Sequence, residues 1–239
     1  QFQKAVAQCR FTHIHFRDVF SDLMTVYTDP GMDEPIFHWE TLDRIIEIIL
    51  QSGMYPFIEI GYMPRDLASS RWELGFGSHP NVSPPRSALR WKQLIKAFLN
   101  HYKTVYGLET LRQWRFDFWN SANIQFDNGY WPGSREQFFE LYRWTYEAFM
   151  DVDRQLSLGS PNFSLPAGMD WYEAFFDFCI QNKMKPAFLS LHMYSCMDHM
   201  DDNPGIFPYP PTTYNYLSLT NTEYTRNILR FLKDMLKKH

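Results

Sequence analysis

Cysteine is scarce in this sequence. Only three of the 239 residues are cysteines, namely Cys9, Cys179 and Cys196. An odd number at wide spacing argues against a disulfide framework and favours a reducing compartment. The chain also shows no signal peptide and no apolar run long enough to span a bilayer. These absences predict a cytoplasmic protein with no membrane partner.

Clustered positive charge is lacking as well. The formal net charge is -4, and the one basic run is the short tail Lys237-Lys238-His239. Because phosphate binding needs a clustered positive face, this chain is not expected to contact DNA directly. Any contact with DNA would belong to another domain of a longer parent chain.

Residue use is otherwise that of a globular protein, with 45% hydrophobic and 21% charged residues. Aromatic residues are abundant at 18%. They suit stacking against ring-shaped ligands, but a large core uses the same residues, and we favour the core explanation. The length is sufficient for one sizeable core.

Short apolar segments alternate with longer amphipathic ones along the chain. Strands are predicted over residues 11–18, 56–62, 113–120, 156–160 and 186–194, and helices over residues 2–8, 41–51, 86–106, 134–152, 170–182 and 220–239. A capping box is predicted at residues 134–137, and residues 170–173 and 220–223 are predicted to cap the last two helices. Such alternation indicates a parallel sheet covered by helices, in one domain over residues 1–239.

Glycine-rich phosphate-binding turns are missing from the predicted strand–helix junctions. An open nucleotide-binding sheet usually carries such a turn, so their absence favours a closed barrel. Polar residues instead gather at the carboxyl ends of several strands: His15, Arg17, Asp18, Glu59, Asn120, Ser121, His192 and Tyr194. The catalytic face of a barrel is built in this way. We therefore predict an α/β fold of the (β/α)8 TIM-barrel type.

Four strand ends carry a more specific pattern. They read H-F-R-D-V-F-S-D at 15–22, P-F-I-E-I-G-Y-M-P at 56–64, F-W-N-S-A-N at 118–123 and L-S-L-H-M-Y at 189–194. In this order they resemble glycoside hydrolase family 39, which contains β-xylosidases and α-L-iduronidases on a (β/α)8 barrel. The resemblance implies that the chain holds about strands two to six of eight and is a fragment of a longer polypeptide. A partner chain, as in a homodimer, could supply the missing strands.

The pattern departs from the family at the catalytic acid. The family's fourth strand ends in W-N-E-P-N, where the glutamate is the general acid/base. Trp119, Asn120 and Asn123 match this motif, whereas Ser121 replaces the glutamate and Ala122 the proline. A serine hydroxyl cannot act as a general acid near pH 7, and general acid help is worth about 10²–10⁴-fold. Two residues differ together, which indicates natural degeneration.

Other family positions are kept in part: Glu59 matches the third strand, and His192 and Tyr194 match the H-x-Y pattern of the sixth. Retaining glycosidases need a second carboxyl group, which the family places on strand seven, beyond the strands recognised here. The family's sugar-contacting histidine on strand two is replaced by Arg17. No catalytic residue is therefore predicted, and Ser121 marks the degenerate acid/base position. The predicted ligand-binding residues are Arg17, Glu59, Asn120, His192 and Tyr194.

Several of these residues also have a structural explanation. Glu59 lies in an apolar strand, where an unpaired charge is costly, so we expect it to pair with Arg17 or His15. His192 and Tyr194 share one face of a strand and could contact a ligand or close the barrel as an aromatic layer. Trp119 is expected to pack in the core. Asp117 is expected to pair with Arg115 or Arg112.

A metal site is considered at His192, Cys196, His199 and Asp202. Their spacing fits no zinc signature, and sulfur mixed with carboxylate is an uncommon ligand set. We therefore expect no metal and no cofactor.

Three functions remain open. The first is a non-catalytic module that binds a carbohydrate or a protein, because the arrangement resembles that of some bacterial AraC-type transcriptional regulators with a degenerate family-39-like domain. The second is an active β-xylosidase-like glycosidase that uses Glu59 or Asp18 as its acid. The third is an oligomerisation domain whose pocket has filled in. The first is the preferred interpretation.

Overall fold

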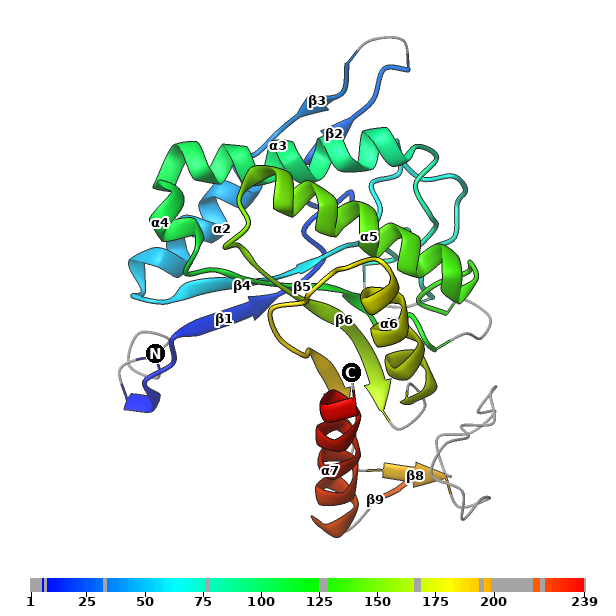
Figure 1. The fold of residues 1–239 in the computed structure, drawn as a ribbon. Coiled ribbons are helices and arrows are strands. Elements are labelled where there is room, and N and C mark those ends of the chain that lie inside the picture. Colours follow the sequence, from blue (N-terminus) through cyan, green and yellow to red (C-terminus); the bar gives the residue numbers. More distant parts are fainter. Residues whose placement is uncertain are drawn as a thin grey trace.

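A five-stranded parallel sheet forms the centre of the fold (Figure 1). The computed structural model describes residues 6, 8–31, 34–75, 78–124, 129–165, 169–193, 196–198, 217–219 and 222–238. The strands pair in the order β1 (His13–Phe16), β4 (Tyr55–Ile60), β5 (Arg115–Asn120), β6 (Ser157–Leu165) and β7 (Leu191–Met193). This sheet curls into a half-barrel, so the predicted incomplete (β/α) barrel is confirmed.

Helices connect the strands and cover the outer face of the sheet (Figure 1). They are α2 (Glu40–Gln51), α3 (Ala88–Tyr106), α4 (Leu108–Leu111), α5 (Arg135–Val152) and α6 (Met169–Gln181). Alternate side chains of the strands point at them: the Phe116 ring lies 6.4 Å from Phe98 of α3 and 5.1 Å from Phe149 of α5, between centroids. Ile58 and Ile60 are fully buried. Since successive strand residues alternate between faces, the inner face receives the polar set.

The helix ends follow local sequence signals. The capping box predicted at the start of α5 is confirmed: Ser134 Oγ accepts from Gln137 N at 3.2 Å, and Gln137 Oε1 accepts from Ser134 N at 2.9 Å. Ser87 Oγ caps α3 by accepting from Arg90 N at 3.2 Å. Gly53, just past α2, has φ +80°, a left-handed conformation that glycine adopts without strain.

Two strand boundaries differ from the prediction. Strand β6 continues past Ser160, its expected end, to Leu165. Pro161 pairs with Phe118 between two register shifts, and such irregularities are where a strand tolerates proline. Strand β7 holds only Leu191–Met193 of the expected residues 186–194.

Two predicted helix caps and one predicted helix differ from the structure or lie outside the described residues. Helix α6 begins at Met169, so Asp170 lies in its first turn instead of capping it. The final helix α7 (Thr222–Lys238) is present, but Thr220, its predicted cap, lies outside the described residues. Most of the helix expected over residues 2–8 lies outside them as well.

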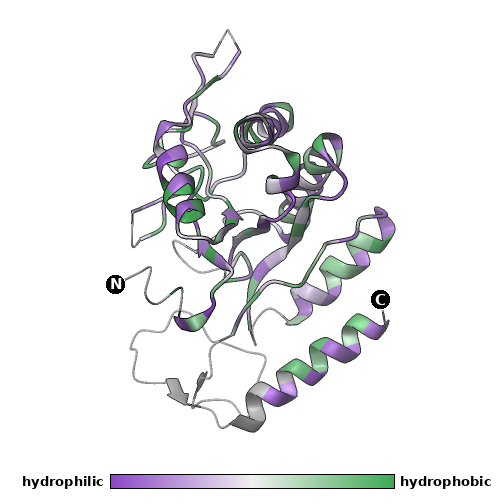
Figure 2. Ribbon diagram, turned by 90° about the vertical axis from the view of Figure 1, so that its left-hand side faces the viewer, coloured by the Kyte–Doolittle hydropathy of each residue, from purple (hydrophilic) through white to green (hydrophobic). Residues whose placement is uncertain are grey.

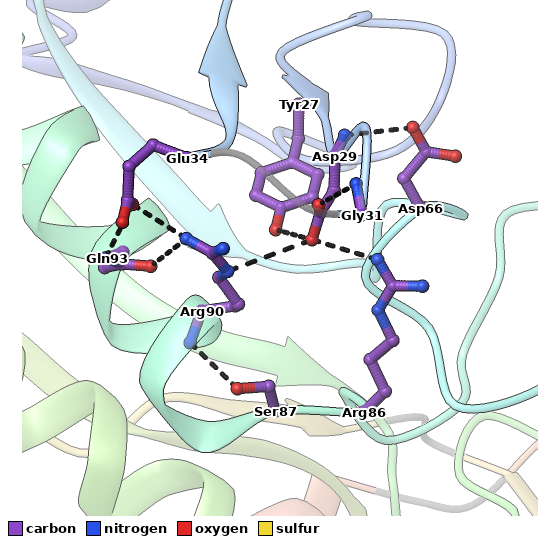
Figure 3. Close-up of polar contacts among 9 residues, drawn as sticks. All are labelled: Tyr27, Asp29, Gly31, Glu34, Asp66, Arg86, Ser87, Arg90 and Gln93. Atoms are coloured by element: carbon purple, nitrogen blue, oxygen red, sulfur yellow. Dashed lines mark hydrogen bonds and ion pairs between the residues drawn. The ribbon is translucent and has the colours of Figure 1, made fainter.

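Two short antiparallel pairs were not predicted. Strands β2 (Tyr27–Thr28) and β3 (Ile36–Phe37) form one, and β8 (Cys196–Asp198) and β9 (Leu217–Leu219) the other. A polar network ties the first pair to the start of α3 (Figure 3). At its centre the Asp29 carboxylate, whose side chain is 4% exposed, accepts from Arg86 Nη2 at 2.9 Å and from Tyr27 Oη at 3.1 Å.

Helix α7 is amphipathic, with apolar and polar residues on different faces (Figure 2). Leu232 and Met235 are buried, whereas Leu229 and Leu236 are about half exposed. Among the described helices, none has the combination of length and apolarity that a bilayer crossing requires.

Candidate functional site

Two carboxylates lie side by side on the inner face of the sheet. In the pairing of β4 with β5, Glu59 is the register partner of Asp117. Partners on parallel strands point to the same face, so the two side chains are neighbours. Glu59 is 0% exposed and Asp117 is 1% exposed. Burial of two adjacent acids is costly unless hydrogen bonds or counter-charges compensate it.

Glu59 is only partly compensated. Its Oε2 accepts a hydrogen bond from Asn120 Nδ2 at 3.0 Å, whereas Oε1 is buried without a partner. Burial, reinforced by the negative charge of Asp117, raises the pKa of Glu59 to about 7. The predicted pairing with Arg17 or His15 is wrong: neither makes a hydrogen bond or ion pair with Glu59, and Arg17 is exposed. Burial excludes the solvated arginine, and the neighbouring Asn120 amide binds the carboxylate instead.

Asp117 is held by three neighbours. Its Oδ1 lies 3.3 Å from His15 Nε2, and its Oδ2 accepts from Ser190 Oγ at 2.7 Å and from Asn162 Nδ2 at 3.5 Å. Burial alone would lower the pKa of His15, but the hydrogen bond to Asp117 and its charge outweigh burial and raise it.

The predicted partners of Asp117 were wrong. Arg115 lies over the Phe188 ring at 5.9 Å, and Arg112 binds Asp153 at 2.7 Å. Arg112 precedes β5, and its guanidinium forms its ion pair outside the strand.

Ser121 directly follows β5 and is buried among neutral groups. Its Oγ lies 2.7 Å from Ser164 Oγ and 3.2 Å from His192 Nδ1, and its N–H donates to Asn162 O at 2.7 Å. The residue is 4% exposed. Among the described residues, no carboxylate makes a hydrogen bond to Ser121.

The imidazole of His192 links Ser121 to Asn162. Asn162 Nδ2 lies 2.9 Å from His192 Nε2, so this nitrogen accepts and the ring proton lies on Nδ1, facing Ser121 Oγ. Burial lowers the pKa of His192. The imidazole is therefore neutral near pH 7, and the network from Ser164 to Asn162 is uncharged.

The backbone at the end of β5 is strained. Trp119 and Ser121 have φ +55° and +49°, values that residues other than glycine adopt rarely, in turns and at functional sites. The indole of Trp119 is fully buried, donates to Tyr130 O at 2.8 Å and meets the Trp131 ring at 5.5 Å between centroids. The packing role predicted for Trp119 is confirmed, and its burial holds the neighbouring Ser121 in place.

The structure brings together three of the five residues predicted to bind a ligand, namely Glu59, Asn120 and His192. Asp117 and Asn162 connect them, because Asn162 Nδ2 faces both the Asp117 carboxylate and the His192 ring. Arg17 follows β1 and is exposed. Tyr194 lies outside the described residues.

Several residues of the site were missed or misjudged in the sequence. They are His15, Asp117, Asn162 and Ser164. Asn162 and Ser164 alternate with Phe163 and Leu165, which is the period of a strand and could have revealed them, but they lie beyond the predicted end of the strand at Ser160. Of the four residues considered for a metal, His199 and Asp202 lie outside the described residues.

A surface cavity of about 400 Å³ lies apart from these side chains. It is bounded by Pro84, Pro85, Trp131, Glu136, Gln137, Glu140, Leu141 and Trp144. None of the candidate residues lines it, so it belongs to the outer helical layer.

Comparison with known proteins identifies the fold family. A sequence model described as "Glycosyl hydrolases family 39" matches residues 1–203. The chain belongs to glycosyl hydrolase family 39. The family resemblance of the strand ends is thereby confirmed.

Curated family-39 relatives are similar over most of this chain. A β-xylosidase of Caldicellulosiruptor saccharolyticus is 34% identical over 199 residues, covering 81% of this chain and 39% of the relative. A β-xylosidase of Geobacillus stearothermophilus is 32% identical over 189 residues, which cover 77% of this chain and 36% of that relative. The chain thus spans less than half the length of the relatives it matches.

A solved family-39 structure supports the same architecture. The crystal structure of a monomeric β-xylosidase from Caulobacter crescentus CB15 superposes with a TM-score of 0.83 at 24% identity. It covers 99% of this chain and 45% of that enzyme. The half-barrel of the present chain therefore corresponds to part of the fold of the Caulobacter crescentus β-xylosidase.

Proposed function

We propose that this chain is a carbohydrate-binding, non-hydrolysing glycosidase-like module of a bacterial AraC-type transcriptional regulator. Because its relatives are β-xylosidases, we infer a β-xyloside or xylose-containing sugar as the ligand class. The observation that carries the proposal is the alcohol of Ser121 at the end of β5, surrounded by Ser164 and His192, both neutral.

Proton donation to a leaving sugar is the chemistry that this arrangement does not support. A hydroxyl has a pKa far above neutrality, and the lowered pKa of His192 removes the imidazolium as a substitute acid. The Nδ1 proton of His192 is also engaged with Ser121 Oγ. We infer that a bound glycoside would be retained intact.

Carbohydrate binding suits the same groups. Sugars present hydroxyls that both donate and accept hydrogen bonds, and Asn162, Ser164 and His192 offer both kinds of atom near one another. The exposed guanidinium of Arg17, at the end of β1, adds a donor that is not committed to Glu59. We propose Arg17 and the partly exposed His192 as the direct sugar contacts, with the buried Asn162 and Ser164 behind them.

The regulatory setting rests on the resemblance and on charge. With a net charge of -4, the chain offers no clustered positive face, so DNA contact is assigned to another domain of the parent protein. Xylose added to the full-length protein should change its affinity for its own promoter DNA. A full-length protein that binds no DNA would refute the regulatory part.

Calorimetry with xylose and xylobiose tests the binding part. We expect Arg17→Ala to weaken binding, and the matched variant Arg44→Ala, which removes an exposed arginine from the outer helix α2, to leave it unchanged. Absence of binding by the unmodified protein would refute the proposal. So would hydrolysis of 4-nitrophenyl β-xyloside at ordinary enzymic rates.

An active glycosidase is the second candidate, favoured by one observation. The pKa of Glu59, raised to about 7 by burial and by Asp117, is that of a general acid. The carboxyl is fully buried, however, and its Oε2 holds Asn120, which keeps it from a leaving group. Turnover that is abolished in Glu59→Gln would establish this candidate and overturn the first.

A further inference from the structure

The inner face of the sheet carries one compact set of metal-binding side chains. His15, Glu59 and Asp117 each offer one ligand atom, and these atoms all lie within 4.8 Å of one another. The residues come from three adjacent strands, β1, β4 and β5. We propose that they bind a divalent transition-metal ion, represented by Zn²⁺.

The outer hydrogen bonds orient both carboxylates toward this position. In Asp117, Oδ2 accepts from Ser190 and Asn162, which leaves Oδ1 toward His15. In Glu59, Oε2 accepts from Asn120. Each acid thus has one oxygen fixed by surrounding donors, while the other is unpartnered in Glu59 and faces the His15 ligand nitrogen in Asp117. Outer groups orient metal ligands in this way.

The unpartnered oxygen is an independent indication. Glu59 is 0% exposed, and its Oε1 has no hydrogen-bond partner. A buried oxygen without a partner is costly, and a cation beside it would compensate that cost. No arginine or lysine within the described residues forms an ion pair with Glu59, so a bound cation would have no competing partner there.

The distances and the ligand types suit the proposed ion. Zn²⁺ binds nitrogen and carboxylate oxygen at about 2.0–2.2 Å in a tetrahedron, which separates ligand atoms by about 3.4 Å. His15 Nε2 and Asp117 Oδ1 are 3.3 Å apart. An imidazole nitrogen favours Zn²⁺ over Mg²⁺ or Ca²⁺, which prefer oxygen.

Access to the site is through His15. Its side chain is 37% exposed, while Asp117 is 1% exposed beneath it. The imidazole edge packs on Phe57 at 4.7 Å between ring centroids, which fixes its orientation. Three protein ligands and one open side leave a fourth position for water or a ligand oxygen, as in catalytic zinc sites.

Zn²⁺ titration of chelator-treated protein tests the site directly, without sugar. We expect 1:1 binding that His15→Gln weakens at least tenfold. The matched variant His13→Gln removes an imidazole from the same strand and should leave the affinity for Zn²⁺ unchanged. The Nε2 atom of His13 lies 3.0 Å from Gln113 O, so this imidazole is engaged elsewhere. Equal affinity in the His15 variant, or no binding to the unmodified protein, would overturn the proposal.

Two further measurements keep the result interpretable. Asn120→Ala, with native circular dichroism, should weaken Zn²⁺ binding about 10–100-fold through loss of the bond that orients Glu59. Co²⁺ bound to the unmodified protein should show d–d absorption without a thiolate charge-transfer band. A thiolate band would place the metal on a cysteine, such as the exposed Cys9, and would also overturn the proposal. Sugar binding is measured separately, so either proposal can fail alone.

Discussion

Replacement of Glu59 by glutamine should stabilise the metal-free protein at alkaline pH. Glutamine keeps an oxygen to accept from Asn120 Nδ2 and places an N–H beside Asp117, where Glu59 now has an unpartnered oxygen. The neutral amide also removes the repulsion between two buried acids. Glu59→Gln therefore imitates the protonated form of the carboxyl.

The magnitude follows from the pKa of Glu59, raised from 4.5 to about 7 in the folded state. Between these values the folded protein binds more protons than the unfolded chain, so stability falls as pH rises through this window. One pKa unit corresponds to about 1.4 kcal/mol, so ionised Glu59 costs the folded state about 3 kcal/mol above pH 7. At pH 5 the same linkage leaves a cost of only about 1 kcal/mol.

Urea unfolding with a chelator at pH 5 and pH 8 measures this difference. The midpoint for Glu59→Gln should exceed that of the unmodified protein at pH 8, and the gap should shrink at pH 5. Glu173→Gln, the same change on the exposed surface of α6, is the control and should have little effect at either pH. A Glu59→Gln protein that is less stable at pH 8, or a gain that does not depend on pH, would refute the reasoning.

Three other changes test the fold. Ser134→Ala removes the cap of α5 and should lower the free energy of unfolding by about 1 kcal/mol, measured by urea unfolding. An unchanged free energy of unfolding would show that the cap is dispensable. Trp119→Ala empties a fully buried site and should cost about 3–5 kcal/mol, measured in the same way; a cost below 1 kcal/mol would contradict its packing role. Burial alone would raise the pKa of Asp29, but hydrogen bonds from Gly31 N, Arg86 and Tyr27 hold it below its usual range. Its stabilising effect is therefore present above an ordinary aspartate pKa and lost as pH falls through the lowered pKa, so in thermal unfolding Asp29→Asn should destabilise less at pH 3 than at pH 7. Equal destabilisation at both pH values would exclude a charge effect.

The parts of the fold that depend on local pattern could be predicted from the sequence. Helices α2, α3 and α5 begin and end within about two residues of the predicted bounds, because apolar period and caps are local properties. Strand β6 runs five residues past its predicted end, across Pro161, a residue type that locally favours the end of a strand. Only its register with β5, which contains two shifts, shows that proline is tolerated there.

The partners in the candidate site could not be predicted in this way. Glu59 and Asp117 are neighbours because of the register between β4 and β5, and His15 reaches Asp117 across an intervening strand. Register between strands far apart in the chain is set by packing of the whole sheet, which no local pattern shows. The sequence could therefore indicate which polar residues end strands, but not which of them meet.

The surroundings of Ser121 determine how an acidic side chain at this position would behave. A glutamate or aspartate introduced at this position would extend into the Nδ1–H of His192 and the hydroxyl of Ser164. Two donors aimed at a carboxylate favour its ionised form, so the grafted group would be held deprotonated and would be a weak proton donor. A proton-donating carboxyl at this position would therefore require changes to those neighbours together with the residue itself.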